Sequence, residues 1–248
     1  MSAPPADLGA ALAALAARRP LLVASDYDGV LAPLADVPSE ASPEPGTAEA
    51  LERLSAVPGV TVALVSGRGL DDLRTTSGFT GDLRWIGSHG AEFDGPLTGD
   101  LAGRRDELVA RLEPLVTGTP GARLEIKPAS VAVHVRQVPD RPAAAVLLEQ
   151  AARAAADPSL TKKPGKDVFE VAVTDADKGS AVRRLAAEIG AQGVVYLGDD
   201  VTDEDVFRVL GGDDVGVKVG AGETAAAHRV PDPPAVRALL EQLADLLG

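Results

Sequence analysis

The chain has 248 residues, of which 45% are hydrophobic and 25% charged, a balance that suits a globular protein with one large core or a core and a smaller domain. With 24 Lys+Arg against 37 Asp+Glu the net charge is −13, so we expect neither nucleic acid nor an anionic membrane as a partner. The absence of cysteine excludes disulfides, thiol nucleophiles and thiolate metal sites.

The N-terminal third alternates apolar runs with helical patterns. Segment 8–17 is apolar but too short to span a bilayer, and its arginines follow it, whereas a signal peptide carries its charge first. We interpret it as a helix packed on the body of a cytoplasmic protein. Apolar runs predict strands at 21–25 and 60–65, and segment 83–87 resembles a third strand. Helical spacing predicts helices at 47–57 and 70–74.

The last third repeats this rhythm. Its patterns predict helices at 178–189, 203–210 and 234–247 and strands at 193–197 and 215–219. Buried strands that alternate with helices are typical of a parallel sheet covered on both faces.

The middle of the chain has a different pattern. It predicts helices at 106–116 and 143–155 and strands with alternating polar and apolar residues at 123–127, 130–136 and 167–173. We interpret it as an insertion. The predicted fold class is therefore α/β, with a Rossmann-like parallel-sheet core (residues 1–94 and 173–248) and an inserted, smaller α+β cap domain (residues 95–172).

The first motif that could carry catalytic chemistry contains Asp26 and Asp28. They follow the strand at 21–25, and ligands of open α/β sheets bind where strands end. One carboxylate of such a pair can attack phosphorus, and the other can transfer protons to the leaving group and from water. A plain turn is the alternative, since Asp and Gly both favour turns.

A second acidic motif follows the strand at 193–197 and contains Asp199, Asp200 and Asp203. Three carboxylates on a strand-to-helix turn suit a hard cation with oxygen ligands. A cap for the next helix is the alternative, but capping needs only one acid.

Two further motifs supply groups that bind anions. Ser66, Gly67 and Arg68 follow the strand at 60–65, where a hydroxyl and N–H groups at a helix start can bind phosphate. Arg68 can add charge-assisted bonds to a phosphoryl group or to the sugar. The alternative is a serine cap with a solvated arginine. Lys178 lies at the start of a predicted helix, where the helix dipole disfavours a cation unless an anion or a carboxylate lies beside it. The alternative is an exposed lysine.

In this order, the four motifs resemble those of the haloacid dehalogenase-like superfamily of phosphohydrolases. Several phrases also resemble the trehalose-6-phosphate phosphatase family, namely those at 28–33, 65–68, 87–92 and 198–204 and the pairs Glu125/Lys127 and His134/Arg136. Val30 and Ser88 depart from that pattern, where Thr and Asn are more usual.

The insert also carries a polar set that suits a sugar. Glu125 and Lys127 share one strand face, as do His134 and Arg136, and Glu170 lies opposite the apolar side of its own strand. A sugar presents many hydroxyl groups, so we expect these residues to bind the distal sugar under a closing cap. A solvated outer face of an antiparallel sheet is the alternative.

The resemblance implies a mechanism. Mg²⁺ would be held by the Asp26 carboxylate, the Asp28 backbone carbonyl and Asp199, with Asp200 and Asp203 in support. The metal, Lys178 and Ser66 would neutralise the phosphoryl group, which a chain of net charge −13 otherwise repels. Asp26 would form an aspartyl phosphate, and Asp28 would act as acid and then base.

The expected function is hydrolysis of trehalose 6-phosphate by a monomer. One alternative is a sibling phosphatase that acts on sucrose phosphate or on a mannosyl phosphoglycerate. Others are a phosphomutase, which would release no net phosphate, and a non-catalytic sugar-phosphate sensor, since a fold alone never fixes a function.

Overall fold

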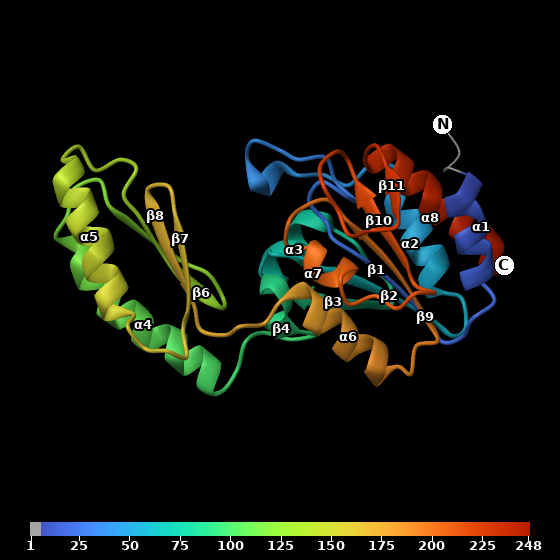
Figure 1. Cartoon of the computed structure of the whole chain (residues 1–248), viewed down its shortest axis with the longest axis horizontal. Coiled ribbons are helices and arrows are strands. Elements are labelled where there is room, and N and C mark those ends of the chain that lie inside the picture. Colours follow the sequence, from blue (N-terminus) through green and yellow to red (C-terminus); the bar gives the residue numbers. More distant parts are fainter. Residues whose placement is uncertain (1–5) are drawn as a thin grey trace. The chain divides into compact units, whose positions relative to one another are not determined.

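The computed structural model describes residues 6–248 and divides the chain into two compact units (Figure 1). The larger unit comprises the chain up to Asp94 together with Ala176–Gly248, and the smaller comprises Gly95–Asp175. Val173, expected in the larger unit, packs instead in the hydrophobic cluster of the smaller one. Its N–H donates to the Ala129 carbonyl (3.0 Å), so the chain stays in the smaller unit beyond the last strand there.

The larger unit is built on a seven-stranded sheet within the described residues, in the order β11-β10-β9-β1-β2-β3-β4. All neighbours are parallel except β3 and β4. The strands are β1 (Leu21–Ser25), β2 (Val60–Val65), β3 (Leu83–Gly87), β4 (Glu92–Phe93), β9 (Gly193–Gly198), β10 (Val215–Val219) and β11 (His228–Val230).

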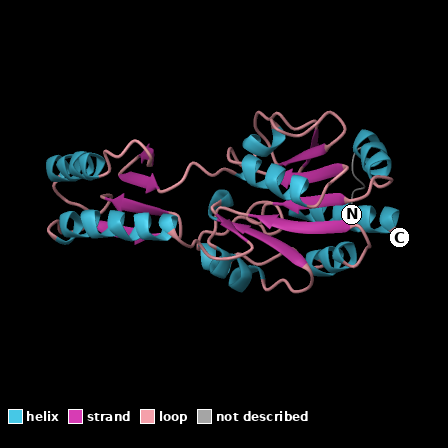
Figure 2. Ribbon diagram, turned by 90° about the horizontal axis from the view of Figure 1, so that it is seen from below, coloured by secondary structure: helices cyan, strands magenta, loops and turns pink. Residues whose placement is uncertain are grey.

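Helices cover both faces of this sheet (Figure 2), which confirms the predicted α/β class. Alternate residues of β1 show why: Leu21 and Val23 pack in one hydrophobic cluster with α1, α2 and α8, while Leu22 and Ala24 pack in another with α6 and α7. The helices of this unit are α1 (Ala6–Leu15), α2 (Thr47–Ser55), α3 (Leu70–Ser77), α6 (Lys178–Glu188), α7 (Glu204–Phe207) and α8 (Pro233–Leu247), with 3-10 turns η1 (Pro38–Glu40) and η2 (Ser88–Gly90).

The smaller unit is a four-stranded antiparallel sheet with two helices. Its strand order is β5-β6-β8-β7, and α4 and α5 lie together on one side of it (Figure 1). Val131, Val133, Phe169 and Val171 pack with these helices in one hydrophobic cluster. The elements are α4 (Asp100–Thr117), β5 (Arg123–Ile126), β6 (Ser130–His134), α5 (Arg141–Ala154), β7 (Thr161–Gly165) and β8 (Val168–Ala172).

Most expected elements are present, and the misses are short or polar. Strands β4, β7 and β11 were not predicted from the sequence. Helix α4 begins six residues before the expected start at residue 106, and α7 is shorter than the expected helix at 203–210. Among residues 6–248, each helix is too short or too polar to cross a lipid bilayer.

Candidate active site

Asp26 occupies the middle of the C-terminal edge of the large sheet. It follows β1, which lies between β2 and β9, and its N–H donates to the Leu197 carbonyl (2.9 Å). Its side chain is largely buried, and Oδ1 accepts a hydrogen bond from the Tyr27 N–H (2.7 Å). Tyr27 itself is fully buried against Phe79. A buried aromatic side chain therefore anchors the backbone that presents Asp26.

Lys178 places a buried ammonium group against Asp26. Its Nζ donates to Asp26 Oδ2 (2.6 Å) and to Asp203 Oδ1 (2.8 Å), and the side chain is 1% exposed. It is the first residue of α6, a position fixed by a capping box between Asp177 and Ser180. The two carboxylates offset both the desolvation of the ammonium and its unfavourable place at a helix start.

Asp203 organises the acidic turn from inside. It is fully buried, and its Oδ1 accepts from Lys178 and from the Tyr196 hydroxyl (2.7 Å). Its Oδ2 accepts from the N–H groups of Asp199 and Asp200 (2.9 Å each). Each oxygen of Asp203 thus already holds two donors.

The site has a donor set that fits Mg²⁺. Carboxylate oxygens of Asp26, Asp199 and Asp203 lie within 4.8 Å of one another, and hard cations prefer such ligands. Because Asp203 is committed to four donors, Asp26 and Asp199 are the carboxylates that fit as direct ligands. Gly29 makes room for this set, since a Cβ there would lie 2.1 Å from Asp199 Oδ2.

The electrostatics of these carboxylates favour a cation. Burial raises the pKa of Asp26 to about 7, with Lys178 opposing the rise and Asp203 adding to it. Burial also raises the pKa of Asp199 to about 6, with Asp203 and Asp200 adding to it. A divalent cation between the two would favour their ionised forms. Strongly shifted carboxylates at a strand edge are typical of functional sites.

Lys178 keeps its charge in this setting. Burial alone would lower the pKa of Lys178, but the Asp26 and Asp203 carboxylates outweigh it and raise that pKa. The site therefore holds one fixed positive charge before any metal binds.

Ser66 and Gly67 follow β2, next to the strand that ends at Asp26. Ser66 is buried, and its hydroxyl accepts from the Arg68 N–H (3.2 Å). A Cβ on Gly67 would lie 2.5 Å from the imidazole Cε1 of His89, so this position has no room for a larger residue while His89 stays in place.

Arg68, expected to bind a phosphoryl group or the sugar, has several partners within the chain. Its Nε and Nη2 donate to the two oxygens of Asp28 (2.6 and 2.7 Å), and its Nη1 donates to Asp72 (2.9 Å). Nη2 also donates to the Pro38 carbonyl (2.6 Å), and the guanidinium lies over the Tyr27 ring. Arg68 therefore ties the second acid of the Asp26/Asp28 pair to the loop that carries η1.

The two departures noted in the sequence have different surroundings. Val30 is fully buried in a hydrophobic cluster, where the hydroxyl of a threonine would need a partner. Ser88 has a left-handed backbone (φ 49°) and donates to Glu92 Oε2 (2.7 Å). Asparagine tolerates positive φ better than serine does, which gives a physical reason for asparagine at this position.

One face of the small sheet carries the polar residues expected to bind sugar. Glu125, Ala132, Glu170 and Lys163 pair in one row across its four strands and share that face. The Nε2 of His134 lies 2.6 Å from Glu125 Oε2. The opposite face is the one that packs on α4 and α5.

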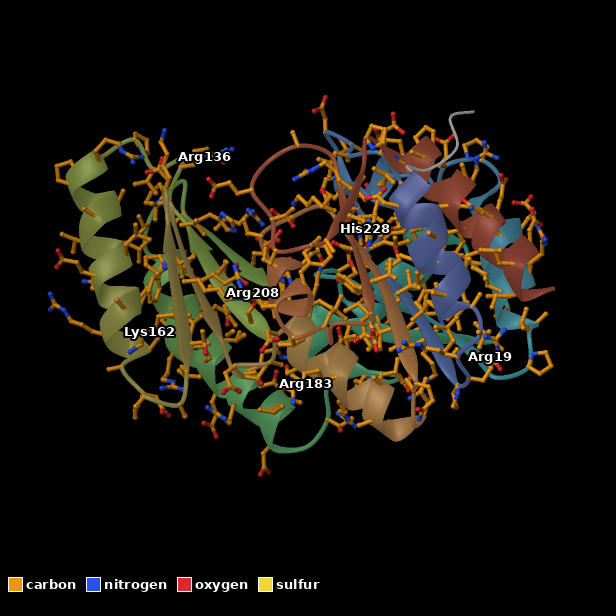
Figure 3. All side chains as sticks on the ribbon, turned by 45° about the vertical axis from the view of Figure 1, so that its right-hand side comes forward. Arg19, Arg136, Lys162, Arg183, Arg208 and His228 are labelled. Carbon is orange, nitrogen blue, oxygen red and sulfur yellow. The ribbon has the colours of Figure 1, made fainter. Side chains whose placement is uncertain are left out.

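Lys127 lies close to Glu170, whereas Arg136 lies apart. Glu170 accepts from Lys127 Nζ (3.1 Å) and from the Ser130 hydroxyl (2.6 Å). Burial alone would raise the pKa of Glu170, but Ser130 and Lys127 outweigh it and lower that pKa. Strand β6 ends at His134, and Arg136 is exposed in the turn that follows (Figure 3), so its expected place on the strand is wrong.

Two further residues lie beside the acidic turn and were not predicted from the sequence. Tyr196 of β9 is fully buried and donates to Asp203. Lys218 of β10 is 5% exposed, and its Nζ donates to the Asp199 carbonyl. The sequence contained a signal for Lys218. Lysine is rarely buried without a partner, and here it lies within a run of valine and glycine that predicts a buried strand.

The fold and the site together define a class of protein. A parallel α/β core with these four motifs along one strand edge and a second unit inserted into it is a haloacid dehalogenase-like hydrolase. The family model for trehalose-phosphatase matches residues 24–232, and the chain belongs to this family.

Curated relatives agree with that assignment. A bifunctional trehalose-6-phosphate synthase/phosphatase of Thermoproteus tenax is 36% identical over 239 residues, covering 93% of this chain and 32% of the relative. The chain thus spans about a third of that protein. A probable trehalose-phosphate phosphatase of Sinorhizobium fredii is 32% identical over 235 residues, covering 88% of this chain and 86% of the relative.

Solved structures show the same fold. A trehalose-6-phosphate phosphatase of Aspergillus fumigatus superposes with a TM-score of 0.74 at 26% identity, covering 98% of this chain and 99% of that one. The C-terminal domain of a trehalose-6-phosphate phosphatase of C. albicans superposes with a TM-score of 0.70 at 22% identity, covering 100% of both chains, and at that identity it supports the fold alone.

Proposed function

We propose that this chain is a Mg²⁺-dependent phosphatase that hydrolyses trehalose 6-phosphate through an aspartyl phosphate on Asp26. The observation that carries the proposal is the buried contact between Asp26 and Lys178 beside Asp199, at the edge of the sheet where ligands of such folds bind. Membership of the trehalose-phosphatase family supports the substrate class.

The phosphoryl group would bind between a small number of cationic and hydrogen-bonding groups. Asp26, the Asp28 backbone carbonyl and Asp199 would hold Mg²⁺, with Asp200 and Asp203 in support. When bound, Mg²⁺ supplies a Lewis acid that neutralises charge on the phosphoryl oxygens. Lys178, the Ser66 hydroxyl and the Gly67 N–H would stabilise the same oxygens, which a protein of net charge −13 otherwise repels. These groups therefore make the electrostatic potential at the phosphoryl site positive within a protein of negative net charge.

The covalent step needs a nucleophile and an acid. One oxygen of Asp26 forms a bond to phosphorus while the bond from phosphorus to the sugar oxygen breaks. Asp28 donates a proton to that sugar oxygen as it leaves. Asp28 then takes a proton from water as the water oxygen attacks phosphorus, which frees Asp26 and releases inorganic phosphate.

The contact between Arg68 and Asp28 sets a condition on this mechanism. Both Asp28 oxygens accept from Arg68, as an ionised carboxylate does, so Asp28 must leave the guanidinium and take up a proton from solvent before it can act as the acid. Arg68 keeps its bonds to Asp72 and to the Pro38 carbonyl, so it can stay in place while Asp28 moves. This gives Arg68 the role of a partner that holds the acid between turnovers, in place of the expected bonds to a phosphoryl group or to the sugar.

The polar face of the small sheet would select the sugar. Glu125, Lys127, His134 and Glu170 offer charged donors and acceptors side by side, and hydroxyl-rich ligands need such groups. Arg136 would contribute from the neighbouring turn. These residues would bind the glucose unit that does not carry phosphate.

Phosphate release from a substrate panel tests the proposal. The panel holds trehalose 6-phosphate, glucose 6-phosphate, sucrose 6-phosphate and a mannosyl phosphoglycerate, each with Mg²⁺ or with EDTA. We expect trehalose 6-phosphate to be the best substrate, release to require Mg²⁺, and the Asp26→Asn protein to be folded and inactive. Faster release from another substrate would reassign the specificity, and phosphate transfer to sugar without net release would indicate a mutase.

A further inference from the structure

Lys218 is a buried cation that the chemistry above leaves without a role. It lies in β10 and pairs in register with Gly198 of β9, the residue before Asp199. Its side chain is almost fully buried, and its Nζ donates to the Asp199 carbonyl. Burying an ammonium costs several kcal/mol unless its donors are matched, so a lysine in this strand has to be accounted for.

The alternation of β10 shows how Lys218 reaches the site. Val217 and Val219 pack in the cluster with α1, α2 and α8. Gly216 and Lys218 therefore face the other side of the sheet, where a Cβ on Gly216 would lie 3.0 Å from Phe207 of α7. From this side the lysine ends on the acidic turn that follows β9.

Asp199 is held on both sides of its own Cα. Its N–H donates to Asp203 Oδ2 (2.9 Å), and its carbonyl accepts from Lys218 Nζ. Gly29 lies against its carboxylate, since a Cβ on Gly29 would lie 2.1 Å from Asp199 Oδ2. The two peptide groups that flank a residue set its φ and ψ and so the direction of its side chain. Lys218 fixes one of those two groups.

We propose that Lys218 is a positioning residue for the metal site, which holds the Asp199 carbonyl so that the Asp199 carboxylate points toward Mg²⁺. The inference rests on the proposed function, because it takes Asp199 as a metal ligand. Residues that orient metal ligands typically change metal affinity by about 10- to 100-fold when they are removed.

A purely electrostatic role for Lys218 predicts the opposite sign. An ammonium near a bound dication repels it, so removing that charge would tighten Mg²⁺ binding. Loss of positioning would weaken it. The direction of the change therefore separates the two roles.

The test compares Lys218→Met with Arg229→Met. Arg229 pairs in register with Lys218 on β11 and donates to the carbonyls of Gly220 and Gly222, so its removal deletes a neighbouring cation that serves another loop. Mg²⁺ affinity is measured by calorimetric titration and by the Mg²⁺ dependence of the unfolding temperature, each on full-length protein. Phosphate release from trehalose 6-phosphate by the wild type is recorded in the same buffers.

We expect K218M to need about 10- to 100-fold more Mg²⁺ than the wild type, and R229M to match the wild type. Mg²⁺ binding by K218M that is equal to or tighter than wild-type binding would overturn the proposal. If K218M does not fold in EDTA, Lys218→Thr carries the test: threonine favours strands, and its side chain is too short to reach the Asp199 carbonyl, so wild-type affinity in K218T would overturn the proposal as well. Wild-type protein that binds Mg²⁺ without releasing phosphate would refute the proposed function and leave the positioning role standing.

Discussion

Gly29 offers a way to disturb Asp199 without changing any group that carries charge. It has a left-handed backbone (φ +73°), and a Cβ added there would lie 2.1 Å from Asp199 Oδ2 and 2.5 Å from its Cγ. The Gly29→Ala variant therefore has to displace the Asp199 carboxylate or distort the turn. Either change acts directly on the proposed metal ligand.

The expected size of the effect follows from this geometry. Carbon and oxygen atoms rarely approach closer than 3.0 Å in such contacts, so the Asp199 carboxylate has to move by roughly 1 Å. A misplacement of that size can lower a rate by about 100-fold. The left-handed conformation adds a stability cost of about 1–2 kcal/mol for alanine. We expect turnover to fall about 100-fold in a protein that remains folded.

Gly78→Ala is the matched control. Gly78 ends α3 in the same left-handed region (φ +61°), but a Cβ there would meet no atom within 4 Å. It carries the backbone cost without the clash, so it should lose stability while keeping its activity. Both variants are compared by chemical denaturation and by phosphate release from trehalose 6-phosphate over a range of Mg²⁺ concentrations. Wild-type turnover in G29A, or an equal loss of turnover in G78A, would refute the reasoning.

Three further predictions concern charge. Burial raises the pKa of Asp26 to about 7 and that of Asp199 to about 6, whereas both values are near 4 in the unfolded chain. In EDTA, the two protonated carboxyl groups therefore contribute their full stabilisation below pH 4 and lose it as the pH rises through 6 and 7. Mg²⁺ should stabilise the protein more at pH 8 than at pH 5; thermal unfolding at both values checks this, and a Mg²⁺ effect that does not depend on pH would contradict it. The Lys178→Met variant should lose all measurable turnover and about 3–5 kcal/mol of its free energy of unfolding in urea, because the buried Asp26 and Asp203 carboxylates lose their cation. Wild-type stability in this variant would show that the ammonium group is not needed to hold the two carboxylates. The Glu170→Gln variant should raise KM for trehalose 6-phosphate about tenfold, as expected for one lost bond to a charged group, with unchanged hydrolysis of p-nitrophenyl phosphate. Glu149→Gln, at an exposed position of α5, is the control, and equal losses on both substrates would show that Glu170 does not bind the sugar.

The buried parts of the fold could be predicted from sequence with accuracy. Strands β1 and β2 begin and end at the predicted residues, because a strand covered on both faces is an almost continuous apolar run bounded by turn residues. Strand β3 also has the predicted bounds, although it contains Arg84 and is only partly buried. Strand β7 was missed for the opposite reason. Its sequence, Thr-Lys-Lys-Pro-Gly, is polar and exposed, and only its pairing with β8 makes it a strand.

The site could be predicted in outline but not in its contacts. Asp26 and Lys178 are 152 residues apart, and the resemblance of the four motifs to a known superfamily predicted that they belong together. The pairing of Arg68 with Asp28 could not be predicted, because an arginine side chain is long enough to reach several acceptors. The Pro38 carbonyl, which also accepts from Arg68, is brought near the guanidinium only by the folded loop. Lys218, by contrast, could have been found from the sequence, because a charged residue within an apolar strand is unusual.

The account depends most on Asp26 as the residue that accepts phosphate. The direct measurement is rapid quenching in acid of the wild-type enzyme with trehalose 6-phosphate and Mg²⁺ over a series of times, followed by peptide mass spectrometry. The account predicts one phosphoryl group on the peptide that contains Asp26, and none in the Asp26→Asn protein. Steady phosphate release with no phosphorylated Asp26 at any quench time, or the same label in the Asp26→Asn protein, would contradict it.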